Sequence, residues 1–539
     1  MSVNLGDVLD LVAQTVQPDD PAVICDDVIT TWGDLDRRAN AVARALIAAG
    51  LQPNAKAALY LRNGPAYVES LAATFKGRLA HVNVNYRYGV DELLYILDNA
   101  DAEAVIFGSE FATQAAALMP RAPMVKAWVQ VGGETIAGAQ SYETIASGDG
   151  AALDLERSAD DIFLLYTGGT TGLPKGVMWP ASAFWTANMP GRAAAPGAEP
   201  PATLDALMDQ IRSGAGRMPT YVAPPLMHGT GLFSAVNAMT KGGTVVVTNN
   251  PHFNANEAAA AVAKHKCGSI IIVGDAFARP LVDALRGGEH DVRHVRSMTS
   301  SGMMWSPEVK QRLLEFMPDA VLFDSFGSSE GTGLGVSLVS RDAPPLEAKF
   351  EVASTIVVRP DDFTPVTPGS GEVGLVAKFG NLPLGYYKDP ERTAKTYVMI
   401  NGERHLISGD HATVEADGSI RLLGRGSHCI NSAGEKIYPE EVEEAIKTHP
   451  AVFDALVFGT PDPRFGQTVS AIASLKQGAS ASEAEIIAHV REKLAAYKAP
   501  KKLVLAAVTP RAPNGKADYP AAKELFAHSQ NSPGRDEPP

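Results

Sequence analysis

Short apolar runs alternate with amphipathic stretches along most of the chain. Residues 244–248 and 270–273 are rich in valine and isoleucine, which is typical of parallel strands buried on both faces. Residues 34–48 are rich in alanine, arginine and leucine. The segment that begins at Glu92 has closely spaced apolar residues at Leu93, Leu94, Ile96 and Leu97. Alternation of such strands and helices predicts an α/β protein built in layers.

Residues 190–219 interrupt this pattern. The stretch is rich in glycine and proline around a short helical run near 204–211. We interpret it as a long surface excursion, and two roles remain open for it: a lid or partner surface, or a tolerated insertion.

The composition changes after Gly424. Pro439 is followed directly by two glutamates, which predicts a helix start, because proline fits the first turn and acidic groups complement the helix dipole there. Ser482 and Glu485 form a capping box ahead of another helix. We therefore predict two domains, residues 1–425 and residues 426–539.

The chain has 539 residues, with 47 Lys and Arg against 61 Asp and Glu, and a formal charge of −14. This balance argues against general nucleic-acid binding, which needs cations to neutralise phosphates, but it permits a nucleotide in a local site. No apolar run approaches the about 20 residues of a membrane span, and the N-terminus lacks the basic segment of a secretory signal. The three cysteines, Cys25, Cys267 and Cys429, lie far apart, which argues against a disulfide framework or a zinc site. We expect a cytoplasmic protein.

The most informative segment is 164–177, where an apolar strand runs into a loop of threonines and glycines with one lysine. Glycines allow backbone N–H groups to turn inward, so that amides and hydroxyls surround phosphate oxygens while the lysine adds positive charge. The spacing is not that of a Walker loop. The candidate phosphate-binding residues are Thr167, Gly168, Gly169, Thr170, Thr171, Gly172 and Lys175.

This segment closely resembles the phosphate loop of the adenylate-forming enzymes, which include acyl-CoA synthetases, peptide-synthetase adenylation domains and beetle luciferases. The resemblance continues in the same motif order over roughly residues 25–520. It implies an α/β fold with a large N-terminal adenylation domain of several subdomains and a small mobile α+β C-terminal domain. It also implies ATP, Mg²⁺ and coenzyme A as cofactors and co-substrates.

Two segments resemble the parts of this family that bind adenine. Residues 299–303 are similar to a loop that packs on the base, and residues 324–330 to a motif whose aromatic ring stacks on it. In that motif Glu330 would bind Mg²⁺, a hard cation that prefers oxygen ligands. Phe326 stands where tyrosine is common and Ser329 where threonine is common. The binding residues implied are Ser301, Gly302, Asp324, Ser325, Phe326, Gly327 and Ser329.

Further motifs supply the groups around the reacting atoms and the ribose. By resemblance, His228 would lie beside the substrate carboxylate and the α-phosphate, and Lys516 would reach the same oxygens from the C-terminal domain. Asp410 would accept hydrogen bonds from the ribose hydroxyls, and Arg425 would contact the ribose and phosphate. The catalytic residues implied are Lys516, His228, Thr167 and Glu330.

Residues 426–437 depart from the common family pattern. Ser427 stands where many relatives have an Asp or Lys hinge, and Asn431 stands where many have lysine. The local form resembles a subgroup of bacterial acyl-CoA synthetases that act on fatty acids or on steroid side chains. The loop that would line the pantetheine tunnel contributes Ser432, Gly434 and Lys436.

The resemblance implies AMP-forming activation of a carboxylic acid followed by thioester formation with coenzyme A. The acid is expected to be a medium- or long-chain fatty acid or a steroid-side-chain acid, bound near Gly274, Met303, Gly327 and Leu334. An aryl acid and a short thioether acid stay open as alternatives. The partners are then the acid, ATP and coenzyme A, without nucleic acid or a membrane span, and a homodimer is left open.

Three alternatives remain at this point. The acceptor could be a carrier protein, or the reaction could be luciferase-like. Residues 327–331 also match the nucleophile elbow of α/β hydrolases, with Ser329 as nucleophile and His405, His411 or His428 as its base. A non-catalytic nucleotide-binding scaffold is the third, although Lys516, Glu330 and Asp410 argue against it.

Overall fold

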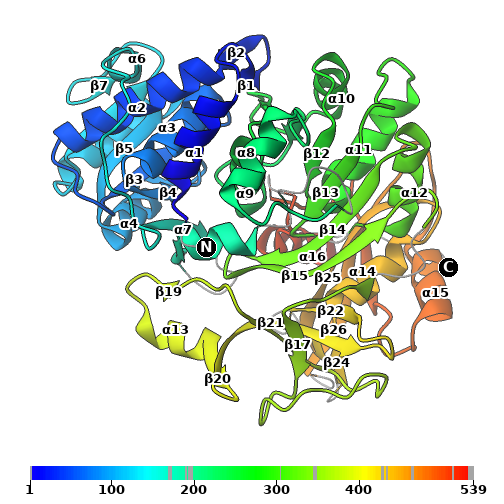
Figure 1. Ribbon diagram of the computed structural model, residues 1–539. Coiled ribbons are helices and arrows are strands. Elements are labelled where there is room, and N and C mark those ends of the chain that lie inside the picture. The colour runs from blue at the N-terminus through cyan, green and yellow to red at the C-terminus, as the bar shows by residue number, and fades with distance from the viewer. Residues whose placement is uncertain are drawn as a thin grey trace. The chain divides into compact units, whose positions relative to one another are not determined.

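The computed structural model describes residues 3–167, 173–188, 191, 198–303, 305–343, 349–425, 430–432, 435–462, 466–512 and 515–531. The chain divides into two compact units (Figure 1). The first consists of Met1–Leu346 and Lys378–Leu406, and the second of Glu347–Ala377 and Ile407–Pro539. The predicted domains, residues 1–425 and 426–539, divide the chain at a different point and stay a prediction.

The first unit contains two eight-stranded sheets. One has the order β15-β14-β13-β12-β10-β11-β1-β2, with parallel neighbours except at the two edges. β11 and β12 fall on the two apolar runs predicted as buried strands, which confirms that prediction. The strands are β1 (Pro21–Cys25), β2 (Val28–Thr31), β10 (Thr220–Val222), β11 (Val245–Val247), β12 (Ser269–Ile272), β13 (Ser297–Ser301), β14 (Val321–Ser328) and β15 (Gly331–Val339).

The other sheet has the order β19-β9-β8-β4-β3-β5-β6-β7. Its neighbours are parallel from β8 to β7, and β9 and β19 add two antiparallel strands at one edge. The strands are β3 (Lys56–Tyr60), β4 (Ala80–Asn83), β5 (Ala102–Gly108), β6 (Ala127–Val131), β7 (Gln140–Ser141), β8 (Ile162–Thr167), β9 (Lys175–Pro180) and β19 (Gly385–Tyr386).

Helices pack on both sheets and complete the layers expected from the sequence. The largest buried cluster combines residues of both sheets with residues of α1, α2, α3 and α9. α2 and α4 confirm the two predicted helical segments. The helices of this unit are α1 (Leu5–Thr15), α2 (Trp32–Ala48), α3 (Pro65–Lys76), α4 (Val90–Ala100), α5 (Ala112–Leu118), α6 (Tyr142–Ala146), α7 (Ala181–Ala187), α8 (Leu204–Arg212), α9 (Gly229–Thr240), α10 (Ala255–Lys264), α11 (Gly274–Arg286), α12 (Pro307–Phe316) and α13 (Pro390–Thr396), with short 3-10 turns at Ser109–Phe111 and Met119–Arg121.

The glycine- and proline-rich stretch 190–219 contains a packed helix. α8 contacts α1, and its buried side chains Leu207, Met208 and Ile211 belong to the largest core cluster (Figure 1). Residues 190 and 192–197 lie outside the described residues. Over 204–212 the excursion is therefore part of the core, which favours a structural insertion there.

The second unit combines two smaller sheets with three helices. One sheet has the order β16-β22-β21-β18-β17, and the other has the order β24-β23-β26-β25, with β27 paired to β26. β20 pairs with residues 403–406 of β21, which belong to the first unit together with β20. β21 carries the chain from the first unit into the second. The strands are β16 (Lys349–Phe350), β17 (Thr355–Val358), β18 (Gly374–Phe379), β20 (Tyr397–Ile400), β21 (Glu403–Val414), β22 (Ile420–Arg425), β23 (Ile430–Ser432), β24 (Glu435–Ile437), β25 (Val452–Asp462), β26 (Gly466–Leu475) and β27 (Lys502–Leu505).

The helix signals of this region are confirmed. α14 (Pro439–Lys447) begins at Pro439 with two glutamates in its first turn. α15 (Glu483–Lys493) starts with the capping box of Ser482 and Glu485, in which both reciprocal hydrogen bonds are present. The remaining helix is α16 (Tyr519–Asn531).

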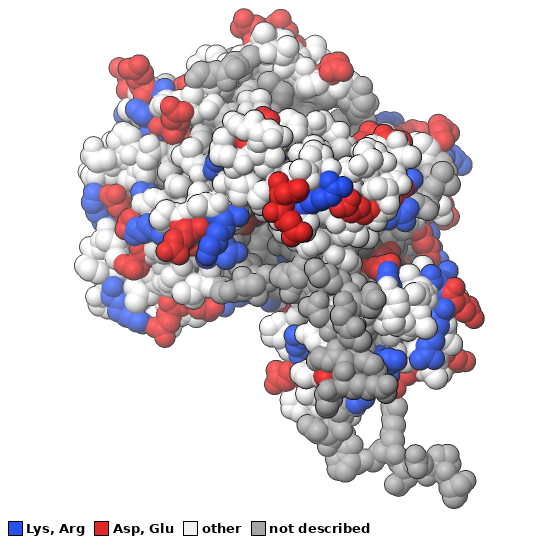
Figure 2. All heavy atoms as spheres, turned by 90° about the horizontal axis from the view of Figure 1, so that it is seen from below, with Lys and Arg blue, Asp and Glu red and all other residues white. Residues whose placement is uncertain are grey.

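Within the described part of the chain, no helix is long and apolar enough to cross a membrane. Acidic and basic side chains are interspersed over the face shown in Figure 2, where no broad patch of one sign is visible.

Candidate active site

The two ends of the predicted phosphate loop are fixed by paired strands. Thr167 ends β8 and Lys175 begins β9, and these two residues are direct partners in the antiparallel register. The loop residues Gly168, Gly169, Thr170, Thr171 and Gly172 lie outside the described residues. The Lys175 ammonium lies 2.8 Å from a carboxylate oxygen of Asp389, the residue that caps the N-terminus of α13. This hydrogen bond from Lys175 is the main reason that the pKa of Asp389 is lowered.

Asn83 joins the phosphate-loop strand to the segment that carries His228. Its side-chain amide donates to the carbonyl oxygens of Tyr166 and Met227, at 2.9 and 2.6 Å, and its amide oxygen accepts from Tyr166 N at 2.6 Å. Asn83 is buried at the carboxyl end of β4, where it pairs with the residues directly before Thr167 and His228. One side chain thus holds two predicted site segments together.

His228 lies at the N-terminus of α9 and is half-buried. The next residue, Gly229, lies beside Leu165 of β8 and near the turn between β14 and β15. A methyl group added at Gly229 would lie 3.3 Å from Leu165 Cδ2 and 3.8 Å from Ser329 Oγ. The His228 segment, strand β8 and the Ser329 turn therefore meet at one place.

The predicted adenine residues lie at the ends of β13 and β14. Ser301 and Ser325 are direct partners in the parallel register, and Gly302 follows with φ +90°. Phe326 and Ser328 flank a register shift at Gly327 in the pairing of β14 with β15. Thus the two segments that resemble adenine-binding parts are neighbours in one sheet.

Asp324 is buried and has a specific cation at its carboxylate. Lys310 Nζ on α12 donates to Asp324 Oδ2 at 2.7 Å, and the Lys310 side chain is only 3% exposed. The Trp305 ring centroid lies 5.4 Å from the same ammonium. The ion pair fixes α12 against β14 at the base of the candidate adenine site.

Glu330 lies in the turn between β14 and β15, and three aromatic side chains donate hydrogen bonds to residues of this turn. The Tyr386 hydroxyl donates to Glu330 Oε1 at 2.8 Å, and the Tyr397 hydroxyl donates to the Glu330 carbonyl oxygen at 3.1 Å. Trp179 Nε1 donates to the Ser329 carbonyl oxygen at 2.9 Å. Burial, and secondarily Glu330 itself, raises the pKa of Tyr386 to about 12, so its hydroxyl remains a proton donor at neutral pH.

The same turn excludes the hydrolase alternative. A nucleophile elbow places its serine between a strand and a helix. Ser329 instead lies between two antiparallel strands, β14 and β15, whose pairing begins again at Ser328 and Gly331. The match of residues 327–331 to the elbow pattern is therefore a coincidence of sequence.

The donor set around Glu330 fits a magnesium ion that arrives with a nucleotide. Among the residues that the structure describes, no group of three or more His, Cys, Asp or Glu side chains could hold a metal ion. A single carboxylate is enough when phosphates and water supply the other oxygen ligands. Ser328 Oγ and Thr332 Oγ1 are buried beside this turn without a hydrogen-bond partner in the described part of the chain. Such atoms agree with a polar ligand at this turn.

The candidate residues for the ribose, the pantetheine path and the catalytic lysine lie in the second unit. Asp410 on β21 and Arg425 on β22 are direct cross-strand partners. The fifteen positions that separate them in the sequence therefore bring them opposite each other in the antiparallel pair of strands. Asp410 is buried, and its backbone N–H donates to Ser408 Oγ at 3.2 Å. Ser432 ends β23 and Lys436 lies in β24, opposite Asn431. Gly434, Ser427 and Cys429 lie outside the described residues.

Lys516 lies in a turn that closes on itself. Ala512 N donates to the Lys516 carbonyl oxygen and Gly515 N to the Ala512 carbonyl oxygen, both at 2.8 Å, and the Lys516 side chain is exposed. Arg511 anchors this turn through a two-pronged ion pair with Asp454, at 2.7 and 2.8 Å. Hydrogen bonds to Ala512 and the ion pair of Arg511 thus hold the described residues next to Lys516.

Two family models match the chain. One, described as AMP-binding enzyme, covers residues 12–372, and the other, described as AMP-binding enzyme C-terminal domain, covers residues 441–516. The chain belongs to the AMP-binding enzyme family. The predicted adenylate-forming family is thereby confirmed.

Curated relatives of this AMP-binding enzyme match it over nearly its whole length. A medium/long-chain-fatty-acid–CoA/3-oxocholest-4-en-26-oate–CoA ligase of Mycobacterium tuberculosis is 41% identical over 534 residues, 97% of this chain and 96% of the relative. A 3-oxocholest-4-en-26-oate–CoA ligase of Rhodococcus rhodochrous is 39% identical over 553 residues, with 97% and 96% covered. These names agree with the predicted acid–CoA ligase.

Solved structures confirm the predicted fold class. The anthranilate CoA ligase AuaEII in complex with anthranoyl-AMP has a TM-score of 0.82 at 22% identity, covering 97% of this chain and 98% of that one. The amide bond synthetase McbA from Marinactinospora thermotolerans has a TM-score of 0.81 at 21% identity, covering 97% and 99%. At these identities the likeness shows the fold alone.

Sequence patterns did not reveal four residues that the structure connects to the site: Asn83, Lys310, Tyr386 and Asp389. Each acts through a partner distant in sequence, such as Met227 for Asn83 and Lys175 for Asp389. The one local signal was Asp389 before Pro390, which marks the start of a helix. That signal locates α13 but says nothing about Lys175.

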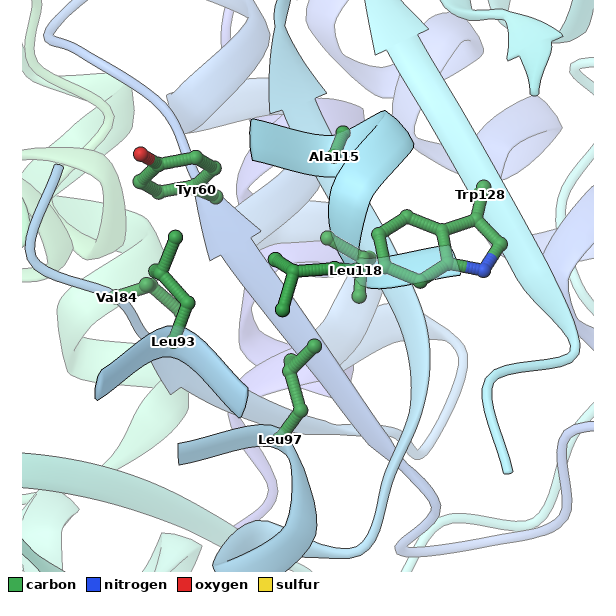
Figure 3. Close-up of a pocket in the computed structure, with 8 residues that line it drawn as sticks. Tyr60, Val84, Leu93, Leu97, Ala115, Leu118 and Trp128 are labelled. Atoms are coloured by element: carbon green, nitrogen blue, oxygen red, sulfur yellow. The ribbon is translucent and has the colours of Figure 1, made fainter. Parts of the chain in front are cut away.

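The predicted acyl-site residues are distinct from the small cavity in Figure 3. Gly274 begins α11 with φ +53°, and its N–H donates to Ser300 Oγ at 2.8 Å, while Leu334 is fully buried in β15. The cavity in Figure 3 lies instead among apolar side chains such as Leu97 and Trp128. It is lined by none of the predicted site residues, so we regard it as a packing gap.

Proposed function

We propose that this AMP-binding enzyme is an AMP-forming acyl-CoA synthetase. It joins a carboxylic acid to coenzyme A and converts ATP to AMP and diphosphate by way of an acyl-adenylate. The main support is the meeting of the helix N-terminus that carries His228 with the turn that carries Glu330, beside strand β8. Asn83 ties the same His228 segment to the strand that leads into the phosphate loop.

In the first half-reaction, an oxygen of the substrate carboxylate attacks the α-phosphorus of ATP, and the bond to diphosphate breaks. Lys175, Thr167 and the loop between them bind the β- and γ-phosphates. His228 and Lys516 neutralise charge on the reacting oxygens, so the protein contributes positioning and electrostatic stabilisation. Bound Mg²⁺ would offset phosphate charge, with Glu330 as its protein ligand.

The adenosine part is bound in this proposal by the ribose and adenine residues that the motifs predict. Asp410 accepts hydrogen bonds from the ribose hydroxyls, and Arg425 contacts ribose and phosphate. The base lies against Phe326, with Ser301, Gly302 and the 324–329 segment around it.

In the second half-reaction, the coenzyme A thiol loses its proton and its sulfur attacks the acyl carbonyl carbon, so that AMP leaves. Ser432, Gly434 and Lys436 line the pantetheine path. Rotation of the C-terminal domain, residues 426–539, exchanges Lys516 for this loop between the two half-reactions.

The acid is a medium- or long-chain fatty acid or a steroid-side-chain acid. The support is the naming of the full-length relatives for both kinds of acid. Gly274, Met303, Gly327 and Leu334 line the acyl pocket in this proposal. The enzyme acts in the cytoplasm on small molecules, and a homodimer is one assembly open to it.

The test is release of diphosphate from ATP with a panel of fatty, steroid-side-chain and aromatic acids, with and without coenzyme A. We expect diphosphate release that depends on the acid and a thioester that forms only when coenzyme A is present. Release of diphosphate without any thioester would support a different acceptor. Absence of acid-dependent release with every acid would refute the proposal.

A further inference from the structure

The short strand β19 lies directly beside the predicted phosphate-loop strand. Gly385 and Tyr386 pair with Met178 and Val177 of β9, the strand that Lys175 begins. From this position the Tyr386 side chain reaches Glu330, 56 residues earlier in the chain. β19 thus links the strand that carries Lys175 to the turn that carries the proposed metal ligand.

The Tyr386 ring is held from several directions. It is only 5% exposed, its backbone N–H donates to Thr393 Oγ1 at 2.9 Å, and the Arg392 guanidinium lies 5.6 Å from the ring centroid. A ring fixed in this way has little freedom to follow a moving carboxylate. The direction of its hydroxyl therefore determines where Glu330 Oε1 can lie.

The Glu330 backbone is fixed at the same time. The Tyr397 hydroxyl donates to its carbonyl oxygen, and the hydroxyl of Tyr386 takes one of its two carboxylate oxygens. Groups that hydrogen-bond to a metal ligand orient it, and their loss typically weakens metal affinity or activity by about 10- to 100-fold.

We propose that Tyr386 is a positioning residue for Glu330: its buried hydroxyl fixes one carboxylate oxygen so that the other faces the cation that accompanies ATP. This inference rests on the proposed function, because it assumes that Mg²⁺ binds with ATP at Glu330. Tyr386 does not touch the nucleotide in this account and acts only through the carboxylate.

The neighbouring residue offers a matched control. The Tyr387 hydroxyl also donates to a carboxylate at 2.8 Å, but its partner is the exposed Asp101, away from Glu330. Tyr386→Phe and Tyr387→Phe therefore remove the same atom from adjacent residues, and only the first removes a contact to the proposed metal ligand.

The experiment measures the Mg²⁺ dependence of diphosphate release, the KM values for Mg·ATP, acid and coenzyme A, and calorimetric binding of Mg·ATP without acid. For Tyr386→Phe we expect the half-saturating Mg²⁺ concentration and the Kd of Mg·ATP to rise by about 10-fold. The KM values for acid and coenzyme A should stay within about twofold, as should every value for Tyr387→Phe. In a Glu330→Ala background, Tyr386→Phe should add nothing, since it acts through the carboxylate.

An unchanged Mg²⁺ dependence in Tyr386→Phe would overturn the inference, as would equal rises in the KM values for acid and Mg·ATP, which indicate general disruption. An additive effect in the Glu330→Ala background would also overturn it. These outcomes are separable from failure of the proposed function. If no acid supports diphosphate release but Tyr386→Phe weakens calorimetric Mg·ATP binding, the proposed function fails while the role of Tyr386 stands.

Discussion

The side-chain ammonium of Lys175 lies 2.8 Å from the carboxylate of Asp389, although the two residues are 214 positions apart. Asp389 uses its other carboxylate oxygen to cap α13, by accepting from Arg392 N at 3.0 Å. The cation predicted to bind the ATP phosphates thus has a protein counter-ion. A triphosphate that binds Lys175 competes with this carboxylate.

Asp389→Asn should therefore strengthen ATP binding. Asparagine still caps the helix, but it removes a negative charge close to the phosphate site. We expect the KM for ATP to fall by about 2- to 5-fold, the range of a partly exposed ion pair. Asp101→Asn is the control, because it breaks the neighbouring pair with Lys388, at 2.7 Å, and should leave this KM unchanged. A higher KM in Asp389→Asn would show that Asp389 assists phosphate binding.

Asn83 should be required for both stability and turnover. Asn83→Ala would leave three buried backbone groups of Tyr166 and Met227 without their partner. Unfilled buried hydrogen-bonding groups destabilise by about 1–3 kcal/mol each, so we expect a loss of about 3 kcal/mol or more. Urea unfolding measures this loss, and kcat should fall at a temperature where the variant is folded. Wild-type kcat in the folded variant would contradict the bridging role.

The buried pair of Lys310 and Asp324 should show strong coupling. Lys310→Met removes the ammonium that donates to Asp324 Oδ2, and removing one partner of a buried ion pair typically costs about 3–5 kcal/mol of folding free energy. Adding Asp324→Asn should recover a large part of that loss, because the buried negative charge disappears. Unfolding of both single variants and the double variant measures the coupling. If the stability losses of the two single variants simply add in the double variant, the Lys310–Asp324 ion pair does not cause the loss seen in Lys310→Met.

His81 should make the protein sensitive to mild acid. It is fully buried in β4, with its Nε2 3.3 Å from the Tyr67 hydroxyl, and burial lowers its pKa from 6.5 to about 3. The native state keeps the ring neutral, while the unfolded chain takes up a proton below about pH 6.5, so stability falls as the pH drops towards 3. At pH 5 the contribution lost is about 2 kcal/mol, at about 1.4 kcal/mol per pKa unit.

Unfolding free energies at pH 7.5 and pH 5 test this prediction against His81→Asn. The loss of unfolding free energy between pH 7.5 and pH 5 should be smaller in His81→Asn by about 2 kcal/mol, since the asparagine side chain does not titrate in this range. An equal difference in both proteins would show that other groups cause the acid sensitivity.

Lys516→Ala should separate the two half-reactions. Its exposed side chain stands on a turn anchored by Arg511 and Asp454, so the substitution leaves the turn intact. We expect adenylation to be lost while thioester formation from supplied acyl-AMP is largely kept. Equal loss of both half-reactions would contradict the role proposed for Lys516.

Local patterns predicted the elements of the fold well. The apolar run at 270–273 forms a buried strand, Pro439 begins a helix, and the capping box at Ser482 is present. Each of these signals depends on residues within a few positions, where backbone preferences and side-chain spacing decide the structure. The motif order likewise indicated the family, because each motif is a short run of characteristic residue types that can be recognised in the sequence alone.

Partners across the fold could not be predicted in the same way. Nothing around Tyr386 indicates that its hydroxyl meets Glu330, and nothing around Lys310 indicates a buried bond to Asp324. Such contacts depend on how strands are ordered in the sheets, which residue spacing does not encode. For the same reason the sequence alone could not reject the match of residues 327–331 to a hydrolase elbow. Its rejection required the pairing of β14 with β15.

The most direct test of the central claim is the fate of the nucleotide when the protein is given ATP, a medium- or long-chain fatty acid and coenzyme A. The account predicts AMP, diphosphate and acyl-CoA in equal amounts, with acyl-AMP as the product retained when coenzyme A is left out. Formation of ADP and phosphate, or no acid-dependent cleavage of ATP with any fatty or steroid-side-chain acid, would contradict it.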